Sequence, residues 1–278
     1  MSIKNILVHV ETAGNAPAQV AAALEFAKAE DAISTTGLCV RPALPFVRGE
    51  IAQIPPEVVE SYNKNLDQEL FPAAKKIFKS AAKKVGMEDK AVWETAVGDT
   101  AQLLERKGRY ADLIIVGQTQ QEDTLSNYHR LSDNLVMMAG RPVLVIPDLG
   151  IGDSIGKKVL VAWDGSREAG RAVSDALDIL ARADEVHLFS AGDTKEQADK
   201  KLKGLREYLS NHGIEAAEVL GVTGVKDPGE AMLDHVKHAD LDMIVMGAYG
   251  HSRFREMILG GATRYVLEHT TVPIFMSH

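Results

Sequence analysis

Short apolar runs alternate along this chain with longer stretches in which apolar residues recur every three or four positions. Runs such as Leu113–Gly117 and Met243–Met246 are typical of buried strands. The periodic stretch that carries Val20, Leu24 and Ala27 indicates a helix with one apolar face. Strands that alternate with helices predict a parallel sheet covered by helices on both faces.

The second half of the chain shows this order most clearly. Its predicted strands are Val159–Trp163, Val186–Phe189, Ile214–Val222, Met243–Met246 and Val272–Met276. Ser166 is placed to cap a helix with Ala169, Val173, Ala176, Leu177 and Leu180 on one face. Gly213 is placed to end the second helix, as Gly86 is in the first half. The charged helix Lys195–Arg206 is interpreted as a solvated face.

The two halves repeat one another. Lys4–Val8 matches Lys157–Val161 at an offset of 153 residues, whereas Leu113–Gly117 matches Met243–Gly247 at an offset of 130. Repeats of this length predict two domains, residues 1–150 and 151–278. The Pro, Asp and Gly residues of Pro147–Gly156 read as the linker between them.

The difference between the two offsets places a net 23 extra residues in the first half, between its first strand and Leu113. We assign them to the Pro-rich segment Arg41–Pro56, which carries Leu44, Phe46, Val47 and Ile51. An ordered surface loop is one interpretation of this segment. The alternative is that it covers the crevice of the first half or contacts a partner.

Composition narrows the class of protein. The 278 residues are 45% hydrophobic and 25% charged, as in a soluble globular protein with room for two cores. No apolar run approaches the roughly 20 residues that cross a bilayer, and the N-terminus shows no signal-peptide pattern. The single cysteine, Cys39, excludes an internal disulfide, so we expect a cytoplasmic protein. A net charge of −8 argues against nucleic acid as a partner.

The stretch Gly247–Thr263, GAYGHSRFREMILGGAT, is a candidate phosphate cradle. Glycine lets a backbone approach a ligand closely, and the N–H groups of a helix N-terminus attract anions. Arg253 and Arg255 add positive charge between the glycine pairs. Ordinary turns use the same glycines, so the motif alone leaves both interpretations open.

Asp164 follows the first strand of the second half, within WDGS. If the first and fourth strands are neighbours, Asp164 and Gly247 lie at one carboxyl edge of the sheet and face one crevice. A carboxylate there can accept hydrogen bonds from ribose hydroxyls. DGS is also good turn chemistry, so a turn or helix-capping aspartate remains the alternative.

With these residues the chain resembles the universal stress proteins, specifically the tandem type, over nearly its whole length. The resemblance rests on KKVLVAWDGS, on the spacing of Gly247, Gly250 and Gly260, and on the closing TVPIF. It implies an α/β fold of two tandem Rossmann-like domains, of the adenine nucleotide alpha hydrolase-like type, each a five-stranded parallel sheet with helices on both faces. It also implies a UspA-like, non-catalytic stress-response protein that binds ATP or AMP, with or without Mg²⁺.

The resemblance places the ribose at Asp164, the phosphates at the glycines and the adenine near Phe189–Ala191. The implied site residues are Asp164, Gly165, Ser166, Ser190, Gly247, Gly250, His251, Arg253, Gly260, Gly261, Ala262 and Thr263. Gly261 departs from the family pattern, which has Ser or Thr there. Loss of one neutral hydrogen bond costs about 0.5–1.5 kcal/mol and weakens binding without abolishing it.

The first half keeps little of this pattern. Glu11 stands where Asp164 stands, and Gly117 matches Gly247. The replacements are Gln120 for Gly250, His129 and Arg130 for Gly260 and Gly261, and Asp123, beside Glu122, for Arg253. We predict that this half does not bind ATP in the same way.

Other chemistry has little support. The chain has neither a P-loop nor a G-x-S-x-G motif. His235 and His238 have helical spacing that could hold a metal, but no third ligand is apparent, and Cys39 is expected in a buried strand. The alternatives to a nucleotide sensor are a nucleotide-free scaffold for protein partners and a slow ATPase. The resemblance implies that the last strands pair as an intramolecular pseudo-dimer, and a homodimer of two chains is open.

Overall fold

The computed structural model describes residues 2–41, 55–118, 131–148, 151, 154–192, 194–216, 218–223, 227–248 and 261–278. Its first half contains β1 (Asn5–His9), α1 (Ala16–Ala29), β2 (Ser34–Arg41), α2 (Pro56–Val85), the 3₁₀ helix η2 (Glu88–Lys90), β3 (Ala91–Val97), α3 (Thr100–Gly108), β4 (Leu113–Gly117), α4 (Leu131–Met138) and β5 (Val143–Ile146). Its second half contains β6 (Lys158–Ala162), α5 (Arg167–Asp175), α6 (Leu177–Leu180), β7 (Glu185–Gly192), α7 (Lys195–Asn211), β8 (Glu218–Thr223), α8 (Pro228–His238), β9 (Met243–Gly247), α9 (Gly261–His269) and β10 (Ile274–Ser277).

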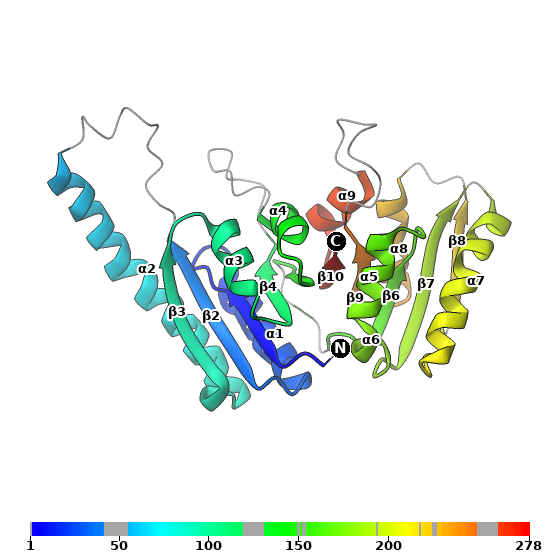
Figure 1. Cartoon of the computed structure of the whole chain (residues 1–278), viewed down its shortest axis with the longest axis horizontal. Helices are drawn as coiled ribbons and strands as arrows, with labels where there is room; N and C mark the ends of the chain where they lie inside the picture. The colour runs from blue at the N-terminus through cyan, green and yellow to red at the C-terminus, as the bar shows by residue number, and fades with distance from the viewer. Residues whose placement is uncertain are drawn as a thin grey trace.

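The described strands form one ten-stranded sheet in the order β3-β2-β1-β4-β5-β10-β9-β6-β7-β8. Within each half all neighbouring strands are parallel, which confirms the predicted Rossmann-like arrangement. The halves meet where β5 and β10 pair antiparallel, with Leu144 opposite Phe275. The two halves therefore join inside one chain, as the expected pseudo-dimer requires (Figure 1).

Helices cover both faces of this sheet and enclose two apolar cores. Alternate residues of a strand point to opposite faces, so Leu113 and Ile115 pack on one face and Ile114 and Val116 on the other. The first core takes residues from α1, α2, α5 and α7, and the second takes them from α4, α8 and α9. Each core thus contains residues of both halves.

The internal repeat extends to individual hydrogen bonds. Asp112 precedes β4 and accepts hydrogen bonds at 2.9 Å from the backbone N–H groups of Lys4 and Asn5. Asp242 precedes β9 and accepts the equivalent bonds from Lys157 and Lys158, at 3.1 and 3.0 Å. Each aspartate ties the start of its half's first strand to the start of the fourth.

Several predicted helix ends are confirmed. Ser166 caps α5, because its hydroxyl oxygen accepts a hydrogen bond from the Ala169 N–H at 3.1 Å. Gly86 and Gly213 follow α2 and α7 with φ of +74°, the left-handed conformation that glycine adopts without strain. Two boundaries differ from the prediction. The helix after Ser166 divides into α5 and α6, and the strand expected from Ile214 begins at Glu218.

The extra residues of the first half lie partly in α2. This helix has 30 residues, whereas its counterpart α7 has 17, so 13 of the added residues are helical. The assignment of the whole insertion to Arg41–Pro56 was therefore wrong in extent. Residues 42–54, with the four apolar side chains named above, lie outside the described residues.

In the portion of the chain that the structure describes, no helix combines the length and apolar character needed to span a membrane. Cys39 lies in β2 and is buried, as expected. Most of the described polar side chains of α7, such as Glu196, Lys200 and Lys203, are exposed while its leucines are buried, which confirms the solvated face.

Candidate functional site

The candidate site begins where the strand order of the second half reverses, between β6 and β9. These strands are parallel neighbours, with Val159 opposite Met243 and Ala162 opposite Met246. The residues that follow them, Asp164 and Ala248, therefore leave the sheet at the same carboxyl edge. This confirms the adjacency on which the predicted crevice depends, and such switch points are where open α/β sheets bind ligands.

Asp164 occupies a turn at this edge. Its carboxylate oxygen Oδ1 accepts a hydrogen bond from the Ser166 N–H at 2.8 Å, and Gly165 between them has φ of +81°. Asp164 therefore does stabilise a turn, as one of the two interpretations of DGS expected. The side chain is also exposed, so the same carboxylate can present acceptor atoms to a ligand at the edge.

Ser190 lies near the end of β7, the other neighbour of β6. Its side chain is 1% exposed, and its hydroxyl has no hydrogen-bond partner among the described residues. Alternation along β7 places it on the face of Val186 and Leu188, which pack in the core with α5 and α7. A buried hydroxyl without a partner carries a free-energy cost, so a ligand group that bonded to it would relieve that cost.

Gly247 packs the start of α5 against the end of β9. A Cβ atom at this position would lie 2.4 Å from the amide nitrogen of Ala169 and 2.6 Å from the carbonyl carbon of Glu168. No side chain fits there without moving backbone, so glycine is required for close helix–strand packing. Its role toward phosphate stays a prediction.

The remaining predicted residues divide into two sets. Gly261, Ala262 and Thr263 form the first turn of α9, with Thr263 buried. Gly250, His251, Arg253 and Gly260 lie outside the described residues.

Comparison with known proteins agrees with this architecture. Residues 156–278 match the model of the universal stress protein family. This half of the chain is a universal stress protein domain. The family that the motifs of this half predict is thereby confirmed.

Two curated relatives carry the same family name. Universal stress protein Slr1230 of Synechocystis is 27% identical over 183 residues, which is 62% of this chain and 59% of the relative. Universal stress protein YxiE of Bacillus subtilis is 29% identical over 146 residues, which is 43% of this chain and 97% of the relative. The chain thus spans little more than half of the first relative's length.

Solved structures show the fold. A universal stress protein from Archaeoglobus fulgidus covers 100% of this chain, and 99% of its own length is matched, with a TM-score of 0.75 and 20% identity. The fold of the whole chain is therefore that of a universal stress protein. Another universal stress protein was solved in complex with cAMP, and the match covers 53% of this chain and 99% of that protein. The two are 14% identical, and the TM-score is 0.36. That likeness is too low for its ligand to be transferred.

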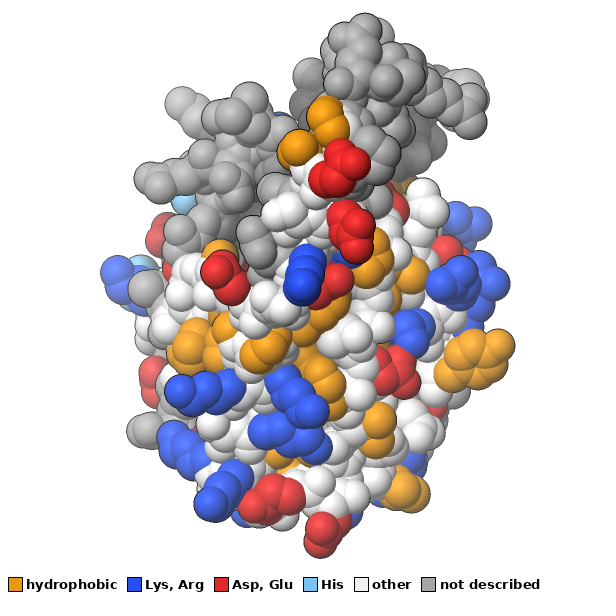
Figure 2. Space-filling view, turned by 90° about the vertical axis from the view of Figure 1, so that its left-hand side faces the viewer, with side chains coloured by type: hydrophobic (Ala, Val, Ile, Leu, Met, Phe, Trp, Pro, Cys, Tyr) orange, Lys and Arg blue, Asp and Glu red, His pale blue; other side chains and the backbone are white. Residues whose placement is uncertain are grey.

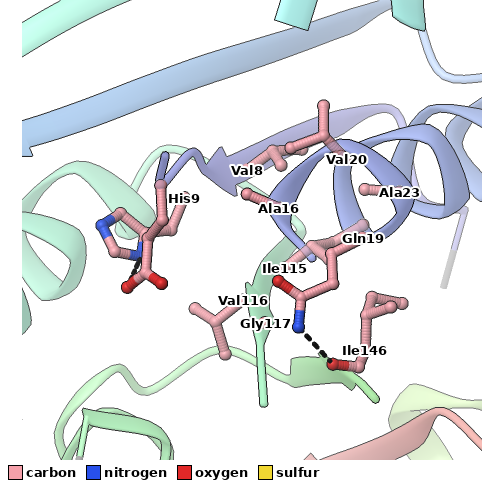
Figure 3. A pocket seen from close by; sticks show the side chains of 11 residues that line it. Val8, His9, Ala16, Gln19, Val20, Ala23, Ile115, Val116, Gly117 and Ile146 are labelled. Carbon is pink, nitrogen blue, oxygen red and sulfur yellow. Dashed lines mark hydrogen bonds and ion pairs between the residues drawn. The ribbon is translucent and has the colours of Figure 1, made fainter. Parts of the chain in front are cut away.

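Side chains of the first half line a narrow pocket at its crevice in the described part of the chain (Figure 3). Gln19 reaches in from α1, and its amide nitrogen lies 3.5 Å from the Ile146 carbonyl oxygen. A Cβ atom on Gly117, the counterpart of Gly247, would lie 2.4 Å from the Gln19 side-chain oxygen. The remaining cavity holds about 10 Å³, space for a single water, whereas ligand pockets hold roughly 300 Å³ or more.

Charged groups of this first crevice also differ from those of the universal stress protein domain. Glu11, the counterpart of Asp164, lies 3.6 Å from Nδ1 of the buried His9. Burial lowers the pKa of His9, and the neighbouring Glu11 opposes this only in part. The Glu11 carboxylate therefore lies close to His9, the last residue of the strand that it follows. Gln120, Glu122, Asp123, His129 and Arg130 lie outside the described residues.

Glu168 is a residue of the second crevice that the motifs did not identify. Its side chain is buried in the first turn of α5, next to Gly247. Burial raises its pKa, but hydrogen bonds from Arg167 and from the backbone, with charge from Arg167 and His278, outweigh burial and leave the pKa below its usual value. An acid two residues after a capping Ser166 was the only available signal, and it is also ordinary helix chemistry.

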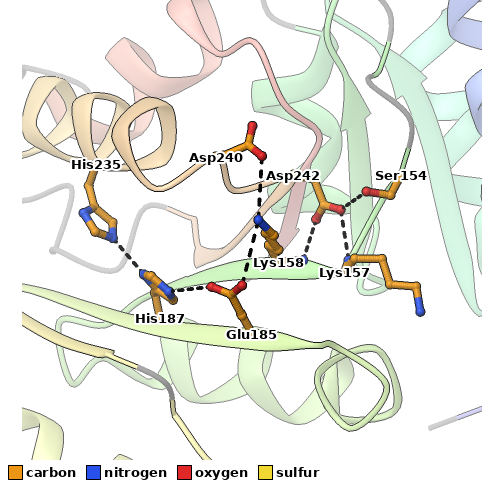
Figure 4. A network of polar contacts seen from close by, with 8 residues as sticks. All are labelled: Ser154, Lys157, Lys158, Glu185, His187, His235, Asp240 and Asp242. Atoms are coloured by element: carbon orange, nitrogen blue, oxygen red, sulfur yellow. Dashed lines mark hydrogen bonds and ion pairs between the residues drawn. The ribbon is translucent and has the colours of Figure 1, made fainter.

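His235, considered above as a metal ligand, instead contacts a histidine of β7 (Figure 4). Its Nε2 lies 2.9 Å from Nδ1 of His187, whose Nε2 lies 3.5 Å from Glu185. His238 bonds to the Asp234 carbonyl oxygen of its own helix at 2.6 Å. Among the residues described, no group of His, Cys, Asp and Glu has the arrangement of a metal site.

Proposed function

We propose that the universal stress protein domain binds an adenine nucleotide, ATP or AMP, and acts as a non-catalytic sensor or regulator in a stress response. The observation that carries this proposal is the edge shared by β9, β6 and β7. Gly247 and Asp164 lie at the ends of the first two strands, and near the end of the third Ser190 buries a hydroxyl without a partner in the described chain.

The residues present fit the chemistry of such a ligand. Asp164 offers an exposed carboxylate to the hydroxyls of a ribose. The first turn of α9, Gly261–Thr263, offers backbone N–H groups to phosphate oxygens. We assign Gly165 and Ser166 to the ribose side, and Gly250, His251, Arg253 and Gly260 to the phosphate side. Mg²⁺ would accompany the phosphates of ATP rather than occupy a protein cage.

The first half contributes differently. Gln19 lines its crevice and leaves only about 10 Å³ beside it, so we propose one nucleotide site per chain, and the first half acts as a degenerate domain. Bound nucleotide would then bias contacts with protein partners, and the proposed compartment is the cytoplasm. No hydrolytic role is included, because Asp164 is assigned to the ribose and to its turn.

Calorimetry on nucleotide-stripped protein tests the proposal. We expect heat of binding with ATP, AMP or both for the wild type. Asp164→Ala and Ser190→Ala should weaken that binding by roughly tenfold or more, since each removes a proposed hydrogen bond to the ligand. Gly250→Glu should abolish binding.

Glu11→Ala is the matched control, because Glu11 holds the position of Asp164 in the first half. It should bind as the wild type does. Equal losses for Glu11→Ala and Asp164→Ala, or no heat at millimolar nucleotide, would contradict the proposal and favour a nucleotide-free scaffold. ATP hydrolysis that disappears with Asp164→Ala would instead favour the slow ATPase.

A further inference from the structure

Helix α2 carries its charges in two blocks, which Pro72 divides. The acidic block, residues 56–71, has four acids and one lysine, a net charge of −3. The basic block, residues 73–85, has five lysines and no acid. The charged residues are Glu57, Glu60, Lys64, Asp67 and Glu69 in the first block, and Lys75, Lys76, Lys79, Lys83 and Lys84 in the second.

Most of these charges face solvent. Lys75, Lys76, Lys83 and Lys84 are exposed, and none lies within 4.0 Å of a carboxylate among the described residues. Lys79 is engaged differently, since it donates to the Ala91 carbonyl oxygen at 2.7 Å. In the acidic block Asp67 is bound to Arg41 at 2.7 Å, whereas Glu57, Glu60 and Glu69 are exposed. Figure 2 looks onto this side of the molecule, where basic side chains gather in the lower part.

The internal repeat shows that this pattern is particular to α2. Its counterpart α7 is 13 residues shorter, and its acids lie on both sides of its run of bases in KEQADKKLKGLREYLSN, so the charges do not fall into one acidic and one basic block. At about 1.5 Å per residue, α2 is roughly 45 Å long. Its N-terminal part extends beyond the sheet (Figure 1). Packing against one face of the sheet requires neither the extra length of α2 nor the separation of its charges into two blocks.

We propose that α2 pairs antiparallel with α2 of a second copy of this chain about a two-fold axis. In that arrangement each acidic block faces the basic block of the other copy, so the attraction occurs twice. A polyanion would be attracted by one block and repelled by the other. Strands β5 and β10 are already paired with each other inside the chain, so neither is available to join two copies.

Exposed apolar side chains lie in the same region. Val58 of α2 is 55% exposed, and Val97 of β3, the edge strand that α2 contacts, is 50% exposed and lies on the same face of the sheet as Trp93 and α2. They supply apolar area to an interface whose register the charges determine.

Sedimentation velocity on two charge-reversal variants tests this pairing. The first variant carries Lys75→Glu, Lys76→Glu and Lys83→Glu, and the second carries Glu57→Lys, Glu60→Lys and Glu69→Lys. The wild type should sediment as a dimer at low salt and dissociate as salt rises. Each variant alone should self-associate roughly a hundredfold more weakly, because like charges then face each other along the helix. An equimolar mixture of the two should form a heterodimer.

The matched control reverses three lysines of α7, with Lys200→Glu, Lys201→Glu and Lys203→Glu. It changes the net charge as the first variant does but should sediment as the wild type. A wild type that stays monomeric at all salt concentrations would overturn the proposal. So would an α7 control that dissociates as the first variant does, or a mixture that stays monomeric. A monomer retained on heparin or on anionic vesicles would identify a polyanion as the occupant instead.

Discussion

Buried polar side chains distinguish the two crevices at the scale of single residues. In the second half, the hydroxyl of Ser190 lacks a partner among the described residues, which leaves an energetic reason to bind a ligand. In the first half, Gln19 and His9 line a pocket of only about 10 Å³. Burial also raises the pKa of Cys39 to about 11, so its thiol is protonated and unreactive near neutral pH.

His9 makes stability depend on pH. Burial holds its pKa below the usual 6.5, so the folded protein keeps the ring neutral while the unfolded chain takes up a proton. The unfolded state therefore binds more protons as the pH falls below 6.5, and the free energy of unfolding should decrease there, by at most about 1.4 kcal/mol per pH unit. His9→Gln should flatten this dependence in denaturant titrations at several pH values.

His212→Gln is the control, since His212 is exposed at the end of α7. It should leave the pH dependence unchanged. If the slope below pH 6.5 is the same with and without His9, the burial of this imidazole does not govern acid stability.

At the scale of elements, the contact between α5 and β9 places the candidate site. The first turn of α5 packs closely against Gly247, so that backbone atoms of Glu168 and Ala169, rather than side chains, contact the end of β9. Ser166 caps that turn and Asp164 precedes it, so the position of the carboxylate depends on this packing.

Gly247→Ala should therefore destabilise the protein. Its Cβ atom would lie 2.4 Å from backbone that cannot move alone, and overpacking of this kind costs about 1–3 kcal/mol. Gly204→Ala in α7 is the matched variant, since its Cβ atom would meet nothing within 4 Å. That change should stabilise the helix by about 0.5–1 kcal/mol. Thermal unfolding of both variants checks the pair, and an equal effect of the two would refute the packing argument.

The sequence could predict elements whose cause is local. Ser166 caps a helix through a contact three residues away, and Gly213 ends one through its own φ. The pairing of β6 with β9 was a condition assumed in predicting the crevice from the sequence, because strand order depends on contacts far apart in the chain. Gln19 escaped prediction because its effect depends on Gly117 and Ile146, which lie about a hundred residues further along the chain. The unpartnered state of Ser190 and the contact between His187 and His235 are likewise tertiary properties.

At the scale of the whole molecule, the two halves share more than the β5–β10 pairing. The Gln118 side chain donates to the Leu267 carbonyl oxygen at 2.8 Å, and its oxygen accepts from the Asp148 N–H at 3.0 Å. Glu30 of the first half forms an ion pair with Arg182 of the second. Because both cores also contain residues of both halves, neither half can unfold without exposing apolar surface of the other.

Calorimetric unfolding should accordingly show one transition, with a van't Hoff enthalpy equal to the calorimetric one. Gln118→Ala should lower the midpoint of that single transition, since it removes about 1 kcal/mol of hydrogen bonding between the halves. Two separated transitions in the wild type would show that the halves are energetically independent.

The pairing of β5 with β10 inside one polypeptide has an evolutionary consequence. In a symmetric assembly of identical subunits every substitution occurs twice, so a side chain that blocks one pocket blocks its twin. Here the first half could acquire Gln19 and a long, charge-separated helix while the second kept a glycine-rich turn. Covalent linkage thus lets the two halves diverge in sequence independently, because a substitution in one half is not repeated in the other.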